Sequence, residues 1–214
     1  MNAAHTHPAT VLRVVGNLNG TRDFEFPVDS GMASFLLLVS LQCRNAILVS
    51  RPSGAELTEA NSALSVDLQA GRILRIDHPE TGQWRVSLAG RGLFVLSVLA
   101  RADTALTGVT FSINPGAANG EEPMSRMRNP LFGVQQDVEV HLTGQVSHLS
   151  LQLVDAAGDR VSDVGALERT AEGFYQASLT PQSERFRILV TGTDASAWPF
   201  ERVYPILFRA LPPK

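Results

Sequence analysis

Apolar and polar residues alternate along most of this chain. The segments Trp84–Leu88 and Val138–Leu142 place an apolar side chain at every second position. This period of two puts the apolar side chains on one face of a β-strand, so each segment predicts a strand with one buried face. No segment of ten or more residues shows the 3.6-residue period of a helix. The pattern therefore predicts an all-β protein with little helix.

The first half carries about eight predicted strands before Asn114, each bounded by Gly, Pro, Asn or Asp. Two of them, Phe35–Leu41 and Leu93–Leu99, are apolar on both faces, which predicts central strands that are covered on both sides. Turns are predicted at Asn17–Gly20 and Ala89–Gly92. Further predicted strands are Val11–Val15, Phe24–Val28, Ala46–Ser50, Arg72–Asp77 and Trp84–Leu88.

Residues 114–129 break this pattern. They are rich in Gly, Pro, Asn and charge and have no apolar period, which indicates a linker or a long surface loop. A second series of strands follows, and Pro205 inside its last member predicts an edge strand or a bulge there. The series comprises Val138–Leu142, Leu149–Val154, Phe174–Leu179, Arg185–Thr191 and Arg202–Arg209.

The two series predict two consecutive antiparallel β-sandwich domains. We place the first at residues 9–113 and the second at 130–212, with 114–129 as the linker between them. Turn signals at intervals of roughly 8–12 residues are typical of a sandwich of the immunoglobulin type. We expect the angle between the domains to depend on how tightly the linker packs.

Short motifs give the first half a family resemblance. Residues 36–102 are similar to the region that follows the von Willebrand factor A domain in hemicentin and related proteins, on the turns Arg51–Gly54, Pro79–Trp84 and Ala89–Gly92. Phe186–Val203 is similar to the immunoglobulin-like domain that comes next in such proteins, although Ala197 replaces the usual glycine. The resemblance implies a jelly-roll or galactose-binding-like sandwich followed by an immunoglobulin-like one. It also implies an extracellular, adhesion-type protein, and its motif residues indicate architecture more than function.

Composition excludes several classes of function. The chain has 214 residues, 44% hydrophobic and 18% charged, which is enough apolar material for two cores and too little charge for a disordered chain. A net charge of -3 with scattered arginines argues against nucleic-acid binding. The first ten residues do not resemble a signal peptide, and the longest apolar runs are too short to span a bilayer. Cys43 is the single cysteine, which excludes an internal disulfide, and we expect a half-buried strand thiol.

The candidate ligand-binding residues are Trp198 and Phe200, on a predicted hairpin loop. Aromatic faces can stack on sugar rings. For both residues, however, the favoured interpretation is an anchor, that is, a loop side chain that packs back onto the sandwich. Trp84 shares a face with Val86 and Leu88, so core packing is favoured over a sugar platform there as well.

No metal, cofactor or catalytic site is predicted. Asp155, Asp159 and Asp163 carry the oxygen atoms that calcium prefers, but their spacing lacks the glycine and the terminal glutamate of an EF-hand loop. Asp155–Asp159 is better explained as a hairpin turn. The five histidines lack metal-ligand spacing, and nucleophile and phosphate-loop signatures are missing from the sequence.

These observations favour a non-catalytic interaction or accessory module that binds a protein partner or spaces a neighbouring domain. A carbohydrate-binding module that targets a partner enzyme is the alternative, with Trp198 as the first residue to test. A hydrolase with a dispersed triad and a subunit that self-associates through an edge strand stay open.

Overall fold

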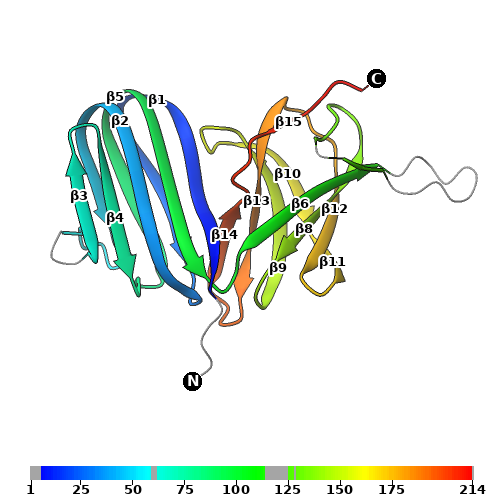
Figure 1. Ribbon diagram of the computed structural model, residues 1–214, viewed down its shortest axis with the longest axis horizontal. Helices are drawn as coiled ribbons and strands as arrows, with labels where there is room; N and C mark the ends of the chain where they lie inside the picture. Colours follow the sequence, from blue (N-terminus) through cyan, green and yellow to red (C-terminus); the bar gives the residue numbers. More distant parts are fainter. Residues whose placement is uncertain (1–5, 59–61, 114–124, 128, 214) are drawn as a thin grey trace, which may run out of the picture.

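The computed structural model describes residues 6–58, 62–113, 125–127 and 129–213. These residues form strands and contain no helix, so none could cross a membrane as a helix. The prediction of an all-β protein made of two antiparallel sandwiches is confirmed. Figure 1 shows the two sandwiches beside each other, with β1 of the first next to β14 of the second.

The first sandwich is one antiparallel sheet of five strands in the order β1-β5-β2-β4-β3. Its strands are β1 (His7–Val28), β2 (Met32–Ser50), β3 (Leu64–Leu68), β4 (Gly71–Asp77) and β5 (Gly82–Ala102).

The three long strands bend at the same level, and the sheet folds over on itself. Phe24 and Phe94 show this fold, because the register separates them by eight positions along the β1–β5 ladder while their ring centroids are 5.5 Å apart. Phe35 and Trp84 likewise meet across the core, with ring centroids 5.1 Å apart. The inner faces of the two halves therefore pack against each other as the two layers of a sandwich.

Glycines mark the bend. Gly20 of β1 pairs with Gly90 of β5, and β2 carries register shifts on either side of Cys43 at the same level. Gly90 is buried so closely against β2 that a Cβ atom there would lie 2.2 Å from the carbonyl oxygen of Cys43. The predicted turns at Asn17–Gly20 and Ala89–Gly92 are wrong: both segments are bends inside continuous strands. Pairs of predicted strands therefore merge into β1, β2 and β5.

The second sandwich has two sheets around its own core. One sheet has the order β11-β12-β8-β6-β7, and the other has the order β10-β9-β13-β14 with β15 paired to β13. Phe111 from the first sheet packs against Phe186 and Phe208 from the second. The strands are β6 (Leu106–Ile113), β7 (Ser125–Met127), β8 (Gln136–Leu142), β9 (Val146–Val154), β10 (Arg160–Ala166), β11 (Glu168–Ala171), β12 (Phe174–Leu179), β13 (Arg185–Asp194), β14 (Pro199–Val203) and β15 (Phe208–Arg209).

The connection between the sandwiches differs from the predicted one. Strand β6 was expected to end the first sandwich, but it pairs with β8 and β7, and its Leu106 and Phe111 belong to the second core. The sheets therefore change after Ala105, and β7 lies inside the predicted linker 114–129. Residues 114–124 and 128 of that linker lie outside the described residues.

Two smaller predictions also change. Pro205 does not lie in an edge strand or a bulge, because the predicted strand Arg202–Arg209 is interrupted there. Its first two residues end β14, and its last two residues form β15. The Cys43 side chain is exposed rather than half-buried, at the bend of β2.

Candidate functional site

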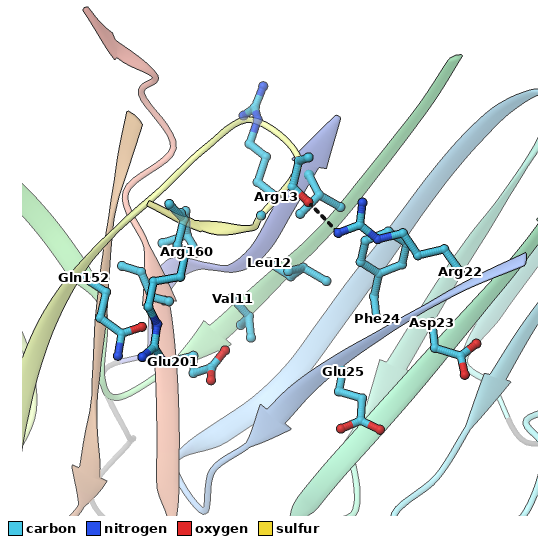
Figure 2. A pocket seen from close by; sticks show the side chains of 16 residues that line it. Val11, Leu12, Arg13, Arg22, Asp23, Phe24, Glu25, Gln152, Arg160 and Glu201 are labelled. Atoms are coloured by element: carbon cyan, nitrogen blue, oxygen red, sulfur yellow. Dashed lines mark hydrogen bonds between the residues drawn. The ribbon is translucent and has the colours of Figure 1, made fainter. Parts of the chain in front are cut away.

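The sandwiches enclose a cleft of about 320 Å³, which we call the interdomain cleft. One wall is the free edge of β1 on both sides of its bend, from Val11 to Val14 and from Arg22 to Glu25. The other wall is the outer face of the sheet that contains β9, β13 and β14 (Figure 2). That wall presents Gln152, Val154, Arg160, Leu189, Glu201 and Val203.

Strand alternation explains which residues of the second wall reach the cleft. Gln152, Leu189 and Val203 are register partners, so their side chains lie in one row on the same face. The residues between them, such as Leu151 and Val190, point into the core of the second sandwich. The wall is thus apolar along its centre and polar towards Glu201.

Arg22 closes one end of the interdomain cleft. Its Nη2 atom donates to Oδ1 of Asp159 at 2.8 Å and to the carbonyl oxygen of Ala157 at 3.4 Å. Figure 2 shows the second of these bonds as a dashed line. The guanidinium carbon also lies 4.9 Å from the centroid of the Phe24 ring, whose face it covers. Phe24 is therefore unavailable as a stacking platform for a ligand.

Glu201 is the exceptional group in the interdomain cleft. Its side chain is partly buried, and among the described residues it forms no hydrogen bond with another side chain or with the backbone. Burial raises the pKa of the Glu201 carboxyl, while the positive charges of Arg160 and Arg202 act in the opposite direction. The Nη1 atom of Arg160 lies 3.6 Å from the Oδ2 atom of Asp163. The Glu201 carboxylate therefore faces the cleft with its hydrogen-bonding capacity unused by the described residues.

Glu201→Gln is expected to raise the thermal midpoint of unfolding at pH 7. A raised folded-state pKa means that the folded chain holds the Glu201 proton more tightly than the unfolded chain does. Stability therefore falls as the pH rises from the ordinary value of 4.5 through the folded-state pKa, and glutamine removes that loss. Thermal unfolding of both proteins from pH 4 to pH 8 checks this result. A variant that is less stable at pH 7 would show that the carboxylate forms a favourable ion pair with Arg160.

A buried ion pair joins the sandwiches beside the interdomain cleft. Arg202 of β14 and Asp29, which follows β1, form it with an Nη2–Oδ2 distance of 2.5 Å, and both side chains are 0% exposed. Arg202 Nε also donates to the carbonyl oxygen of Thr104, in the connection between the sandwiches, at 2.7 Å. The charge that Asp29 carries into this dry interface is therefore neutralised and hydrogen-bonded from the other sandwich.

A second polar contact joins the turn that follows β1 to the end of β13. Asp194 Oδ2 accepts hydrogen bonds from the backbone nitrogen and the Oγ atom of Ser30. Burial acts to raise the pKa of Asp194, but the hydrogen bonds from Ser30, Trp198 and Ser196 outweigh it and hold this pKa below its ordinary value. The relative position of the sandwiches is thus fixed by side chains of the sandwiches themselves. The expectation that the linker 114–129 controls the angle is not supported by these contacts.

Comparison with known proteins places the fold in a family. Residues 9–117, just over half of the chain, match the model of the hemicentin galactose-binding domain-like family. The chain belongs to this family. The matched segment covers the first sandwich from Ala9 onwards and includes β6 of the second. No curated protein matches the chain.

A solved structure shares the fold. It is a DUF4785 family protein from Legionella pneumophila subsp. pneumophila, with a TM-score of 0.50 and 12% sequence identity. The match covers 98% of this chain and 62% of that chain, so this chain spans less than two thirds of that protein's length. At this identity the likeness concerns the fold alone.

Trp198 and Phe200, the predicted ligand-binding residues of this hemicentin-type chain, lie in different environments and form no common site. Phe200 is 1% exposed and packs in the core of the second sandwich, which agrees with its reading as an anchor and removes it as a ligand-binding residue. Trp198 is 41% exposed on the turn that Asp194 caps, with its backbone nitrogen 2.8 Å from Asp194 Oδ1. Neither residue lines the interdomain cleft.

Substitution separates these two aromatic residues. Phe200→Ala is expected to lower the free energy of unfolding by about 3–5 kcal/mol, because it leaves a cavity in the core. Trp198→Ala is expected to change it by less than about 0.5 kcal/mol, because Trp198 is a surface residue outside the core, with 41% of its area exposed. Urea unfolding of both variants tests the pair. A loss of more than about 2 kcal/mol for Trp198→Ala would make this residue an anchor too.

The other sequence candidates have structural roles. Trp84 is buried in the first core and donates its Nε1 hydrogen to the carbonyl oxygen of Glu80 at 2.8 Å. Asp155 Oδ1 accepts backbone hydrogen bonds from Ala157 and Asp159, which confirms a turn. Within the described part of the chain, no group of three or more His, Cys, Asp or Glu residues is arranged to hold a metal ion.

One side-chain pair has the elements of a nucleophile and a base. Thr107 Oγ1 lies 2.6 Å from His141 Nδ1, and the His141 ring stacks on Phe174 with centroids 4.5 Å apart. Within the described ranges no carboxylate bonds to His141, and the pair lines neither the interdomain cleft nor the pockets beside Val164 and beside Tyr204. It lacks the third member and the substrate site that a hydrolytic triad requires.

Sequence reasoning missed the residues of the interdomain cleft. Glu201 stands between the buried Phe200 and Arg202, so alternation could have placed it on the outer face of its strand. No sequence pattern indicates that Glu201 lies beside β1. The two are about 180 residues apart in the chain and meet only because the sandwiches pack together.

Proposed function

We propose that this hemicentin-family chain is a non-catalytic interaction module, in which two sandwiches form one rigid unit that binds a protein partner and spaces neighbouring domains. The buried Asp29–Arg202 pair carries the proposal. A charge that stays buried without its partner is costly, so any sliding of the two sandwiches that separates Asp29 from Arg202 inside the interface is opposed. An extracellular, adhesion-type setting is the context that the family suggests.

Rigidity can be measured as a distance distribution. Cys43 is exposed at the bend of β2 in the first sandwich, and Thr170 is exposed on β11 of the second. Spin labels on Cys43 and on Thr170→Cys are expected to give one narrow distance distribution in pulsed electron paramagnetic resonance. Labels on Cys43 and Arg101→Cys give the width expected of a rigid body, because both residues lie in the first sandwich and Cys43 pairs with Arg91, ten positions along β5 from Arg101. A distribution that is much broader between sandwiches than within one would overturn the rigid-spacer function.

A second candidate function is carbohydrate binding in the interdomain cleft. The cleft lining carries three guanidinium groups, those of Arg13, Arg22 and Arg160, and three carboxylates, those of Asp23, Glu25 and Glu201. Such a balanced lining favours neither anions nor cations, and it offers many hydrogen-bonding groups to a neutral, hydroxyl-rich ligand. The unused capacity of Glu201 is the specific observation in its favour.

A thermal-shift screen against neutral mono- and oligosaccharides tests the carbohydrate function, because a ligand of the folded state raises the midpoint by mass action. Gln152→Ala and Glu201→Gln should abolish the sugar-dependent rise, and Trp198→Ala should leave it unchanged. Loss of the rise in Trp198→Ala alone would move the sugar to the exposed loop. No rise with any sugar would leave the protein-binding function.

A further inference from the structure

Strand β1 has a free edge, which is the side of its backbone that faces away from β5. The register between the two strands is unbroken over Leu12–Val28, so successive residues of β1 point their backbone N–H and C=O groups alternately towards β5 and away from it. Two contacts show which residues point away. The carbonyl oxygen of Arg13 accepts a hydrogen bond from Arg187 of the second sandwich. The backbone nitrogen of Val15 donates to Ala156. The odd-numbered residues of this stretch therefore point to the free edge.

The same alternation places the backbone groups of Asp23 and Glu25 at the free edge, on the stretch of β1 that lines the interdomain cleft (Figure 2). Among the described residues, no group hydrogen bonds to the backbone nitrogen or carbonyl oxygen of either residue. Pro27 is the next odd-numbered residue, and a proline is tolerated in a strand where its nitrogen faces away from the partner strand. Two donors and two acceptors, two residues apart, thus face the cleft without a protein partner.

This edge has the geometry that an additional antiparallel strand requires. Two antiparallel strands form hydrogen-bonded pairs at every second residue, which is the spacing of Asp23 and Glu25. An extended peptide can supply the missing backbone partners and so lengthen the sheet by one strand. The cleft of about 320 Å³ runs along Arg22–Glu25, a length of about 13 Å at about 3.3 Å per residue. These dimensions suit a few extended residues and not a folded domain.

The side chains of β1 indicate which residues an added strand would carry. Residues directly opposite each other in adjacent strands have their side chains on the same face of the sheet. The partners of Asp23 and Glu25 would therefore lie on the exposed face of this layer. The residue between them would lie on the inner face, where the apolar side chains of Val11 and Phe24 line the cleft. The favoured pattern is polar, apolar, polar.

The carboxylates at this edge favour basic side chains on the exposed face. Glu25 is paired with Arg85, but Asp23 accepts its hydrogen bond from the neutral Oγ atom of Ser87. Asp23 and Glu201, which lines the facing wall, form no ion pair with any side chain that the structure describes. A lysine or arginine opposite Asp23 would supply the missing positive charge.

The arginines of the cleft leave this acidic edge uncompensated. Arg22 and Arg160 already lie beside carboxylates of the second sandwich. Arg13 lies on the other side of the bend of β1, away from Asp23. Although the cleft lining as a whole is balanced, the edge at Asp23 is therefore locally acidic.

We infer that the free edge of β1 at Asp23 and Glu25 pairs with an extended segment of a partner protein that carries basic residues at alternate positions. The segment adds one strand to the layer, and the apolar residue between two basic ones enters the interdomain cleft. This inference rests on the protein-binding function proposed above and names its site. In this arrangement a peptide, and not a sugar, occupies the cleft.

Hydrogen exchange of the ¹⁵N-labelled full chain, followed for each amide by NMR, tests the pairing. The probe is the peptide Lys-Val-Lys-Val-Lys, acetylated and amidated at its ends. At about 2 mM peptide, the amides of Asp23 and Glu25 are expected to exchange at least about fivefold more slowly, because they gain hydrogen-bond acceptors. The amide of Phe24 already points to β5 and should not change. The matched control is the same peptide with Glu in place of Lys, which Asp23 repels and which should leave all three rates unchanged.

Two proline variants test the edge itself. Asp23→Pro removes a free donor but no hydrogen bond between β1 and β5, and it should abolish the slowing at Glu25. Asn19→Pro is the matched control, because Asn19 also points to the free edge but lies outside the cleft, so this variant should bind the basic peptide like the wild type. Thermal unfolding shows whether each variant folds. The wild-type exchange rates decide the inference even where a proline variant does not fold.

Two results would overturn the inference. Unchanged exchange at Asp23 and Glu25 with the basic peptide rejects pairing at this edge. Equal slowing by the basic and the acidic peptide rejects the basic partner. The spin-label distance between Cys43 and Thr170→Cys tests the rigid unit separately, so a failure of the edge site is distinguishable from a failure of the proposed function.

Discussion

Arg202→Met is expected to lower the free energy of unfolding by about 3–5 kcal/mol, the largest effect of any polar substitution in this protein. The methionine fills much of the space of arginine but leaves the Asp29 carboxylate fully buried without its partner. It also removes the donor that reaches the carbonyl oxygen of Thr104. The loss should appear in urea unfolding as a lower midpoint.

Two controls isolate the buried charge. Arg85→Met removes an arginine from the exposed pair with Glu25 and should leave the urea midpoint nearly unchanged, because exposed ion pairs contribute little to stability. Adding Asp29→Asn to Arg202→Met should recover part of the loss, because the uncompensated carboxylate is then gone. A loss below about 1 kcal/mol for Arg202→Met would mean that water reaches Asp29 and that the interface is not dry.

Gly90→Ala is expected to destabilise the first sandwich by about 3 kcal/mol or more, beyond the usual cost of overpacking, because the obstacle is backbone. The new Cβ atom would lie 2.2 Å from the Cys43 carbonyl oxygen and 2.8 Å from Leu41 Cδ2. The neighbouring strand β2 would have to move away at the level where the whole sheet bends. Thermal and urea unfolding measure the loss.

Gly54→Ala is the matched control for this substitution. Gly54 also has a positive φ, of 84°, but a Cβ atom there would have nothing within 4 Å. It should therefore cost only the backbone strain of a left-handed residue, about 1–2 kcal/mol. Equal losses at Gly54 and Gly90 would show that backbone conformation, and not the close approach of β2, is what the glycine at the bend provides.

The sequence by itself determined the strands and most of the buried positions. Alternation with a period of two identified the core face of Trp84–Leu88 and of Val138–Leu142, because a strand must place successive side chains on opposite sides. The same pattern and the turn motifs were enough to predict two sandwiches and the hemicentin-type family. These features depend on local geometry and on short segments, which a sequence displays directly.

The tertiary structure alone decided how the strands continue and what they meet. Glycine-rich segments such as Asn17–Gly20 suit both a turn and a bend, and only the pairing of β1 with β5 on both sides of Gly20 selects the bend. Strand β6 could belong to either series, and its pairing with β8 assigns it to the second sandwich. The interdomain cleft with Glu201 arises where surfaces distant in sequence come together, and no local pattern records such a meeting.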